Sequence, residues 1–436
     1  MRDAIATAGI ALVTFMLCVL APLRPLSGDT VPGRIGGAVV RCAGDFDLEH
    51  VDWVRTETAH DRLFYWLQRD EAGEHTSVFG PAPAAVMAVA LLAFGDGDRI
   101  DDDTLRRRER GVAAVLLAIA TVLLVLAARA RVTLPRALLA GAVCTLSFAG
   151  AGTLGQGLWQ ATTALPALTG ALATLAWRDR RPRLALATPA LLLLAVMLRP
   201  TMAPLVLGIG ITWARGTPDR RSWLIATVAA LVLVAPLIVY NAIHLWSPLP
   251  LGQWNANARA TQHVFSLADA TTGVAGLLVS PARGLLWFAP IVIVGTVLGM
   301  RNASYRWIAG GIVLQILAMG MFYLWHGGQA FGPRFLTEAT WVGTWLALGT
   351  ELTARRWLLG VAITVTILVG SLALWRYRPE QWEFPRRPEA HPSLFWNVVD
   401  SPIPATFTDP PRGAVRAYDS PPVNGLACER GQLRSY

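Results

Sequence analysis

The chain has 436 residues, of which 54% are hydrophobic and 15% are charged, and its mean hydropathy is +0.44. Few soluble folds bury so much apolar side chain, so the composition excludes an ordinary soluble protein. The net charge of +9 does not point to nucleic acid, because the arginines lie in short clusters between apolar runs, as the positive-inside rule expects. Long apolar runs favour helices over a barrel, so we predict an all-α polytopic protein whose partner is the lipid bilayer.

The first apolar run covers residues 4–23 and follows Arg2. A cleaved signal peptide is the alternative, but no clear small-x-small cleavage site precedes Gly28 and many runs follow, which favours a retained first helix. Several later runs are short enough to require tilting or burial in a bundle. These later runs cover 79–95, 111–128, 136–150, 159–177, 184–198, 200–214, 222–240, 284–300, 308–325, 339–354 and 357–375.

The arginine clusters reduce the number of crossings. They alternate with weakly charged loops, so all five are assigned to the cytoplasmic side together with the N-terminus. An even number of crossings must then precede Arg129, whereas three runs lie there. The run 79–95 begins with Phe79-Gly80-Pro81 and ends near Asp96, which suits a re-entrant or interfacial segment. We therefore predict about eleven crossings with the C-terminus outside. The clusters are Arg129/Arg131/Arg136, Arg178/Arg180/Arg181/Arg183, Arg215/Arg220/Arg221, Arg301/Arg306 and Arg355/Arg356.

This topology divides the chain into a transmembrane domain, residues 1–375, and an extracytoplasmic tail, residues 376–436. Two large outer loops, 24–110 and 241–283, lie within the domain. The predicted location is the inner (plasma) membrane, crossed many times. Cys42 and Cys428 both fall on the outer side, where an oxidising compartment permits a disulfide; two free thiols are the alternative, and spacing does not choose between them.

The first outer loop carries the strongest chemical signal, reading Gly28-Asp29-Thr30-Val31-Pro32-Gly33-Arg34. An acid and an arginine beside the membrane suit an enzyme that binds a lipid phosphate and deprotonates an acceptor, because an arginine fork matches a phosphodiester and a carboxylate base must reach the acceptor hydroxyl. A solvated loop with helix-capping aspartates is the alternative. Farther along, Asp45, Asp47 and Glu49 form either a divalent-cation site or a solvated acidic turn. The sequence has no His-x-x-x-His or Cys-x-x-Cys pattern, so no metal site is assigned.

Further motifs place a cation or an amide where a span meets the outer boundary. Charged groups at membrane depth are costly and usually face a cavity or a partner, with snorkelling as the alternative. The residues are Gln156 and Trp159 in Gly155-Gln156-Gly157-Leu158-Trp159-Gln160, Arg199 before Pro200-Thr201, Asn241 after Tyr240, Arg283 in Ser280-Pro281-Ala282-Arg283-Gly284, and His326 and Arg334 in the stretch 325–335.

In their order and common face, these motifs resemble the GT-C superfamily of polytopic glycosyltransferases, especially bacterial members related to protein O-mannosyltransferases and lipid A aminoarabinose transferases. The resemblance runs from the first helix to about Phe335. It implies a GT-C-like bundle, an outward-facing active site, a polyprenyl-phosphate-linked sugar as donor and a first-loop aspartate as catalytic base.

Carried over to this sequence, the resemblance makes Asp29 the base and Arg199, Arg283 and Arg334 the candidates for holding the donor phosphate. The remaining donor- or substrate-binding candidates are Arg34, Gln156, Trp159, Asn241 and His326. Thr30 stands where the mannosyltransferases commonly show a second acid, which leaves the base open to Asp45, Asp47 or Glu49. The Trp-Trp-Asp-Tyr-Gly signature of oligosaccharyltransferases is missing, which disfavours transfer to asparagine.

The resulting hypothesis is an inverting transfer of a sugar from its lipid phosphate to an extracytoplasmic glycan, lipid or protein, with a divalent cation as an open question. A secondary transporter and a non-catalytic scaffold of the same fold are the alternatives. Broken helices and membrane arginines also mark transporters, but the sequence shows no repeated halves.

Overall fold

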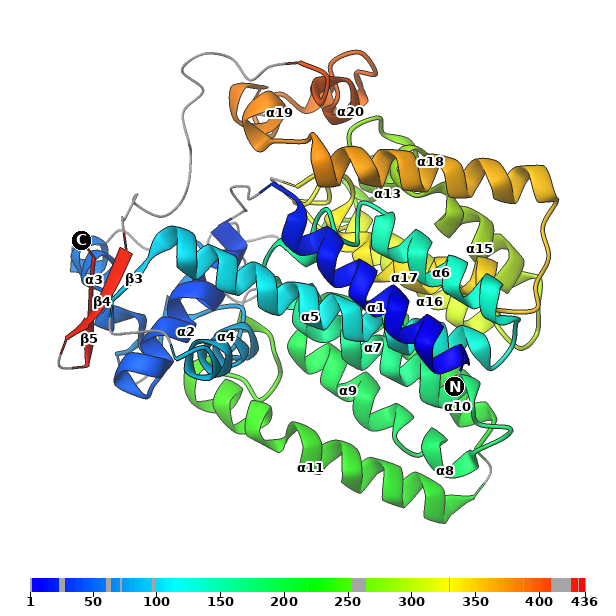
Figure 1. Cartoon of the computed structure of the whole chain (residues 1–436), viewed down its shortest axis with the longest axis horizontal. Helices are drawn as coiled ribbons and strands as arrows, with labels where there is room; N and C mark the ends of the chain where they lie inside the picture. Colours follow the sequence, from blue (N-terminus) through cyan, green and yellow to red (C-terminus); the bar gives the residue numbers. More distant parts are fainter. Residues whose placement is uncertain are drawn as a thin grey trace.

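The structure, a computed structural model, describes residues 2–22, 28–59, 64–70, 73–95, 99–217, 219–252, 264–328, 330–386, 388–408, 425–429 and 431–435. Most of this part of the chain is helical (Figure 1). Four of its helices are long and apolar enough to cross a membrane. They are α1 (Arg2–Leu20), α5 (Asp102–Arg129), α11 (Arg220–His244) and α18 (Arg356–Trp375).

Shorter helices pack between these four. They are α6 (Leu134–Leu146), α7 (Gln160–Ala176), α8 (Pro182–Ala185), α9 (Thr188–Leu198), α10 (Ala203–Arg215), α13 (Ala270–Val279), α14 (Leu285–Phe288), α15 (Pro290–Met300), α16 (Arg306–Gly320) and α17 (Thr337–Leu348). Single 3₁₀ turns connect several of them: η3 (Leu154–Gln156), η4 (Pro200–Met202) and η5 (Arg334–Leu336).

Local sequence explains several of these boundaries. Asp101 caps α5, because its carboxylate accepts a hydrogen bond from the Thr104 amide at 2.8 Å. Pro200 and Pro290 each stand at the start of a new helical segment, because proline lacks the amide hydrogen that would continue the preceding helix. The predicted run 284–300 is therefore two helices, α14 and α15, with a break at Ala289.

The five arginine clusters lie at one end of the helical bundle, together with the N-terminal end of α1. Polar or ring contacts of three clusters reach one another and the residues that adjoin the other two clusters at this end. The contacts are Arg129–Asp3 and Arg131–Asp179, Arg178 to the Thr212 carbonyl and Arg136 to the Leu352 carbonyl, and Arg215 over the Trp307 ring. The positive-inside rule requires such a common side.

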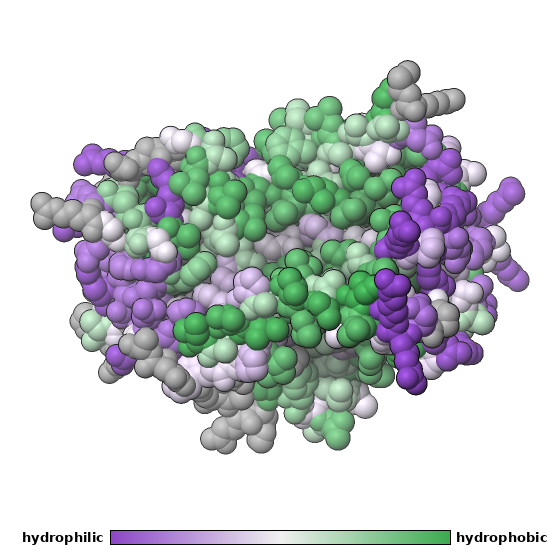
Figure 2. All heavy atoms as spheres, turned by 90° about the horizontal axis from the view of Figure 1, so that it is seen from below, coloured by the Kyte–Doolittle hydropathy of each residue, from purple (hydrophilic) through white to green (hydrophobic). Residues whose placement is uncertain are grey.

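The flanks of the bundle are apolar. On α11, Leu224 and Val232 are 66% and 69% exposed, and Leu368 on α18 is 61% exposed. Figure 2 shows apolar residues across the middle of the face in view and hydrophilic residues at its two ends. Contiguous exposed apolar surface of this kind suits lipid contact. The count of eleven crossings stays a prediction.

The predicted first outer loop is folded. It contains η1 (Gly28–Thr30), α2 (Val31–Ala43), η2 (Leu48–His50), α3 (Asp52–Ala59), β1 (Leu67–Arg69), β2 (His75–Ser77), α4 (Ala82–Ala93) and β3 (Arg99–Asp101). Near the C-terminus, β4 (Gly425–Glu429) and β5 (Gln432–Ser435) extend β3 into an antiparallel sheet of order β3-β4-β5. We call residues 28–101 and 425–435 the outer unit. The all-α prediction is wrong here, because these strands are too short to show an alternating pattern.

The outer unit has its own hydrophobic core, formed around residues such as Trp53, Trp66 and Met87. Helix α4, which covers most of the predicted re-entrant run 79–95, packs against α2 within this unit. The re-entrant or interfacial placement of residues 79–95 in the membrane stays a prediction.

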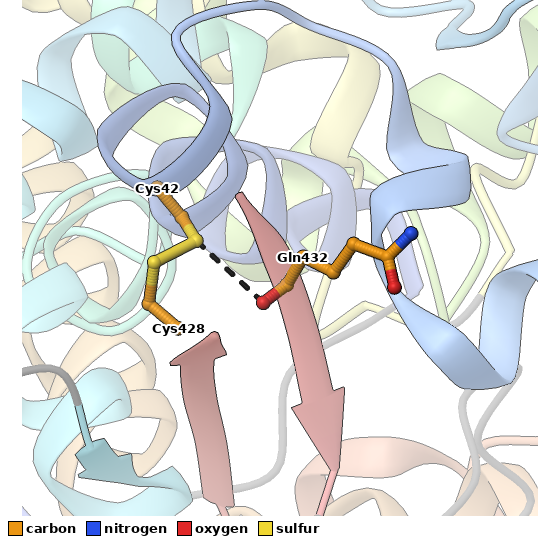
Figure 3. The surroundings of a disulfide bond; sticks show 3 residues. All are labelled: Cys42, Cys428 and Gln432. Carbon is orange, nitrogen blue, oxygen red and sulfur yellow. Dashed lines mark hydrogen bonds between the residues drawn. A yellow bond between two sulfur atoms is a disulfide. The ribbon is translucent and has the colours of Figure 1, made fainter. Parts of the chain in front are cut away.

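A disulfide ties the two parts of the outer unit together. Cys42 at the end of α2 and Cys428 on β4 are bonded, with their Cα atoms 5.7 Å apart and a sequence separation of 386. Figure 3 shows the bond beside Gln432, whose main-chain carbonyl oxygen lies 3.7 Å from the Cys42 sulfur. Of the two states left open by the sequence, the disulfide is confirmed.

The predicted extracytoplasmic tail is also partly folded. It contains α19 (Pro379–Arg386), η6 (Pro392–Trp396) and α20 (Pro402–Ala405), before the strands that join the outer unit. Trp382 and Phe395 from this segment belong to the main core of the bundle. The segment therefore packs on the bundle as part of one body, although the domain boundary at residue 375 stays a prediction.

Candidate active site

A pocket lies where the outer unit meets the helical bundle, at the end remote from the arginine clusters. Its empty space is about 480 Å³. Asp29, Trp159, Arg199 and Arg334, four of the predicted site residues, line it together. The other lining residues are Phe79, Thr153, Leu154, Gln160, Ala161, Thr201, Phe335 and Thr337. The loops before and after several spans thus converge on one cavity.

Asp29 sits in η1, the turn that follows the first span. Its Oδ1 accepts a hydrogen bond from the Tyr65 hydroxyl at 2.6 Å, and its Oδ2 lies 2.7 Å from Nη1 of Arg334. The Asp29 and Arg334 side chains are 15% and 14% exposed. The carboxylate is therefore held from two sides at the wall of the pocket.

Arg334 is fixed along the length of its side chain. Its guanidinium lies over the rings of Trp159, at 5.5 Å, and Phe335, at 5.4 Å. Gly327 has a φ of +76°, and a Cβ there would lie 2.8 Å from Cγ of Arg334. Glycine is needed at this position because it adopts the left-handed backbone and lets the loop close on the arginine stem.

Arg199 is held by a partner outside the pocket lining. Its Nε lies 2.6 Å from Oε1 of Glu338, and the two side chains are 9% and 0% exposed. Its Nη2 also donates to the main-chain carbonyl of Arg334 at 3.4 Å. An arginine offers five donor hydrogens, so this side chain can face the pocket while Glu338 neutralises it from behind.

Two further polar groups complete the lining. Nε1 of Trp159 and Oγ1 of Thr201 are buried, and neither has a hydrogen-bond partner among the residues described. Buried polar groups normally have partners. Together with the two arginines they give the pocket a surplus of hydrogen-bond donors, which suits an anionic ligand that also carries oxygen acceptors.

Tyr65 and Glu338 were missed by the sequence reasoning. Glu338 had a usable signal, because a carboxylate beside an apolar run is costly unless it is paired, and Arg334 lies four residues before it. Tyr65 had none, because only the fold of the outer unit brings it to Asp29, 36 positions away.

Arg34 and Arg283 lie outside the pocket lining, each in a buried ion pair. Arg34 Nη1 is 3.4 Å from Oε2 of Glu109. Arg283 is fully buried, its Nη2 lies 2.8 Å from Oε1 of Glu383, and its Nε donates to the His326 carbonyl at 2.8 Å. These contacts join the outer unit to α5 and α19 to the bundle.

The other predicted binding residues also have positions away from the pocket lining. His326 stacks on Phe395, with ring centroids 4.7 Å apart. Burial, and then the charges of Arg283 and Arg334, lower its pKa to about 3. Gln156 donates to the Ala151 carbonyl at 2.9 Å. Asn241 is 2% exposed on α11, and its side-chain nitrogen has no hydrogen-bond partner in the described part of the chain.

The three acids proposed as auxiliaries are engaged locally. Asp45 contacts His50 at 3.0 Å, Asp47 accepts hydrogen bonds from the amides of Glu49 and His75, and Glu49 lies 2.6 Å from Nδ1 of His75. Their carboxylates thus brace the outer unit and are not gathered around one point.

A different group, where the outer unit meets the end of α11, has the geometry of a cation site. Asp70, Glu74 and His244 offer ligand atoms that all lie within 4.8 Å of one another. Burial, and then the charges of Asp70 and Asp47, raise the pKa of Glu74. We call these three residues the acid–histidine cluster. One imidazole nitrogen and two carboxylates suit zinc or manganese.

No protein-family model and no curated protein matches the chain. Its fold is similar to solved structures of an oligosaccharyltransferase from Archaeoglobus fulgidus. The apo form is 13% identical, with 96% of this chain and 61% of that chain covered and a TM-score of 0.46. The complex with an inhibitory peptide and a dolichol-phosphate is 13% identical, with 97% of this chain and 61% of that chain covered and a TM-score of 0.43.

A complex of the same archaeal enzyme with zinc and sulfate is 14% identical, covers 95% of this chain and 59% of that chain, and has a TM-score of 0.42. The chain thus spans about three fifths of the length of the enzyme it matches. Each of these three TM-scores is below 0.5.

Proposed function

We propose that the chain is an integral membrane glycosyltransferase of GT-C type, which transfers a sugar from a polyprenyl-phosphate-linked donor to an acceptor outside the cytoplasm. The observation that carries the proposal is the pocket, in which Asp29 lies beside Arg334 and Arg199 where apolar helices end. A lipid-linked donor needs both an apolar environment for its chain and cationic donors for its phosphate.

The donor phosphate would lie between Arg199 and Arg334. Arginine binds phosphate through paired N–H donors, and the Trp159 and Thr201 groups, which lack partners among the described residues, supply further donors for sugar or phosphate oxygens. Such donors stabilise the charge that develops on a leaving oxygen, with each well-placed one contributing about 3 kcal/mol. Arg334 and Arg199 are therefore the residues proposed to stabilise the departing phosphate.

Asp29 is proposed as the general base. The acceptor oxygen forms a bond to the anomeric carbon while the bond from that carbon to the phosphate oxygen breaks. The acceptor proton passes to Asp29, and the bonding pair leaves with the polyprenyl phosphate as an anion. Attack from the face opposite the leaving group inverts the anomeric carbon.

The outward orientation rests on the arginine clusters. They gather at the end of the bundle remote from the pocket, and the positive-inside rule assigns that end to the cytoplasm. The pocket then faces outward, where a cell-envelope glycan, lipid or protein is the acceptor, as in aminoarabinose or protein mannosyl transfer. A transporter is disfavoured by a polar site at the end of the bundle, because transporters bind their substrates near the midplane.

The proposal is tested by mass spectrometry of envelope glycans and glycolipids from cells that carry the wild-type chain, Asp29→Asn or Asp45→Asn. Loss of a general base lowers the rate by about 10²–10⁴-fold, so one sugar-bearing species should disappear in Asp29→Asn. Asp45→Asn, which removes an acid outside the pocket, should keep it. Identical profiles for Asp29→Asn and the wild type would refute the assignment of the base.

A further inference from the structure

The carboxylate proposed as the base is bound to the arginine proposed to hold the donor. Oδ2 of Asp29 is 2.7 Å from Nη1 of Arg334, and both side chains line the pocket. Building on the proposed function, we infer that the donor phosphate draws Arg334 away from Asp29. The base then becomes available only when the donor is bound, and Tyr65 is the positioning residue that keeps the carboxylate in place.

The two pocket arginines differ in the position of their carboxylate partners. Glu338, the partner of Arg199, is fully buried and lies outside the pocket lining. Asp29, the partner of Arg334, faces the pocket. A phosphate that enters the pocket can therefore bind Arg199 without displacing Glu338, whereas it must compete with Asp29 for Arg334. Arg199 is the stationary half of the phosphate site and Arg334 is the switching half.

The exchange at Arg334 is confined to its guanidinium. The stem is packed against Gly327, and the charged end lies over the rings of Trp159 and Phe335. The side chain has no need to leave the pocket, because a small rotation of the guanidinium, which forms an ion pair with Asp29, directs its N–H donors to a phosphate. Phosphate competes well for such donors, since it offers more oxygens to a planar fork.

Release of Arg334 uncovers the oxygen that the acceptor must reach. A base needs the acceptor hydroxyl within hydrogen-bond distance, about 2.6–3.2 Å, and Nη1 of Arg334 occupies that distance from Oδ2. The ion pair between Asp29 and Arg334 therefore suppresses proton abstraction when no donor is bound. It therefore predicts that the donor binds before the acceptor is activated.

Tyr65 supplies a contact to Asp29 that does not depend on Arg334. Its hydroxyl donates to Oδ1 of Asp29 at 2.6 Å, on the oxygen that Arg334 does not contact. The Tyr65 ring also lies 6.5 Å from that of Phe79, another lining residue. This hydrogen bond favours the same orientation of the carboxylate when Arg334 turns to the phosphate, which keeps the acceptor oxygen aligned.

The test measures binding of a short-chain polyprenyl phosphate without sugar to the full-length chain in nanodiscs. Asp29→Asn keeps the side-chain shape but removes the competing charge, so it should bind at least about tenfold more tightly than the wild type. Asp45→Asn, a charge change elsewhere in the outer unit, should bind like the wild type. Equal affinity of Asp29→Asn and the wild type would overturn the exchange.

A double-mutant cycle separates exchange at Arg334 from simple repulsion between Asp29 and the phosphate. In an Arg334→Ala background, the exchange predicts that adding Asp29→Asn no longer tightens binding. Tightening by the same factor in both backgrounds would show repulsion alone and overturn the proposal. Failure of the proposed function has a different signature, since the wild type itself would then bind no polyprenyl phosphate.

Tyr65→Phe tests the positioning role with the lipid-linked donor in membranes that hold the acceptor. We expect kcat to fall about tenfold or more while KM for the donor stays within about twofold, because donor binding does not use the hydroxyl. Tyr323→Phe, at a tyrosine outside the pocket lining, is the matched control. An unchanged kcat, or a rise in donor KM without a change in kcat, would contradict the role.

Discussion

The buried pair of Arg199 and Glu338 gives the sharpest prediction from the site. The two side chains are 9% and 0% exposed and 2.6 Å apart. Substituting Glu338→Gln leaves the guanidinium buried without its counter-charge. Removing one partner of a buried ion pair costs about 3–5 kcal/mol, so this variant should be strongly destabilised although it is almost isosteric.

The matched variant replaces both partners with apolar side chains, Arg199→Met together with Glu338→Leu. Replacing a buried pair in this way is often neutral or stabilising, so we expect stability near that of the wild type. Transfer should nevertheless fall by about 10²–10³-fold, the loss typical of removing one donor that stabilises developing charge. The single and double variants together should therefore separate the effect of this ion pair on stability from its effect on transfer.

The assay combines denaturant unfolding in detergent micelles with donor turnover on the same preparations. Wild-type stability in Glu338→Gln would refute the electrostatic account of the pair. Full turnover in the double variant would show that Arg199 is not part of the donor site.

Three other predictions concern regions outside the pocket. Burial lowers the pKa of His326 from 6.5 to about 3, so as the pH falls the unfolded chain takes up a proton on this side chain before the folded chain does. The free energy of unfolding should therefore fall by about 1.4 kcal/mol for each pH unit below 6.5 and be unaffected by His326 above that pH. His326→Gln should remove this pH dependence from thermal unfolding measured between pH 4 and 7. Cys42→Ser should cost about 2–4 kcal/mol and expose the segment around Cys428 to limited proteolysis, whereas unchanged resistance would contradict a stabilising disulfide. Zinc or manganese at about a hundred times its dissociation constant should stabilise the wild type by about 2.7 kcal/mol and leave Asp70→Asn unaffected, while a response retained by Asp70→Asn would exclude the acid–histidine cluster.

The helical membrane bundle could be predicted because its signal is local. Apolar runs and arginine clusters mark the ends of spans in the sequence itself, and the structure gathers those clusters at one end. Within the runs, proline positions such as Pro290 divide one predicted span into two helices. The fold of the outer unit could not be predicted, because β3 pairs with β4 across more than three hundred residues and three-residue strands carry no period of their own.

The pocket was predictable in part for the same reason. Asp29, Trp159, Arg199 and Arg334 stand out as polar residues at span boundaries, and the structure brings these four together. Arg283 has the same sequence signature but pairs with Glu383 on α19, a partner in a segment expected to be only a tail. Sequence position alone does not distinguish an arginine that lines the pocket, such as Arg199, from one that the fold encloses completely, such as Arg283.

Asp29 and its two arginine neighbours are proposed to transfer a sugar from a lipid phosphate. The most direct measurement is the release of polyprenyl phosphate from a polyprenyl-phosphate-linked sugar by the purified chain in nanodiscs, with membrane extract as the source of acceptor. We expect release by the wild type and by Asp45→Asn, and a rate at least about 10²-fold lower in Asp29→Asn. Release at the same rate by Asp29→Asn would contradict the assigned base, and no release by the wild type with any lipid-linked sugar would contradict the function.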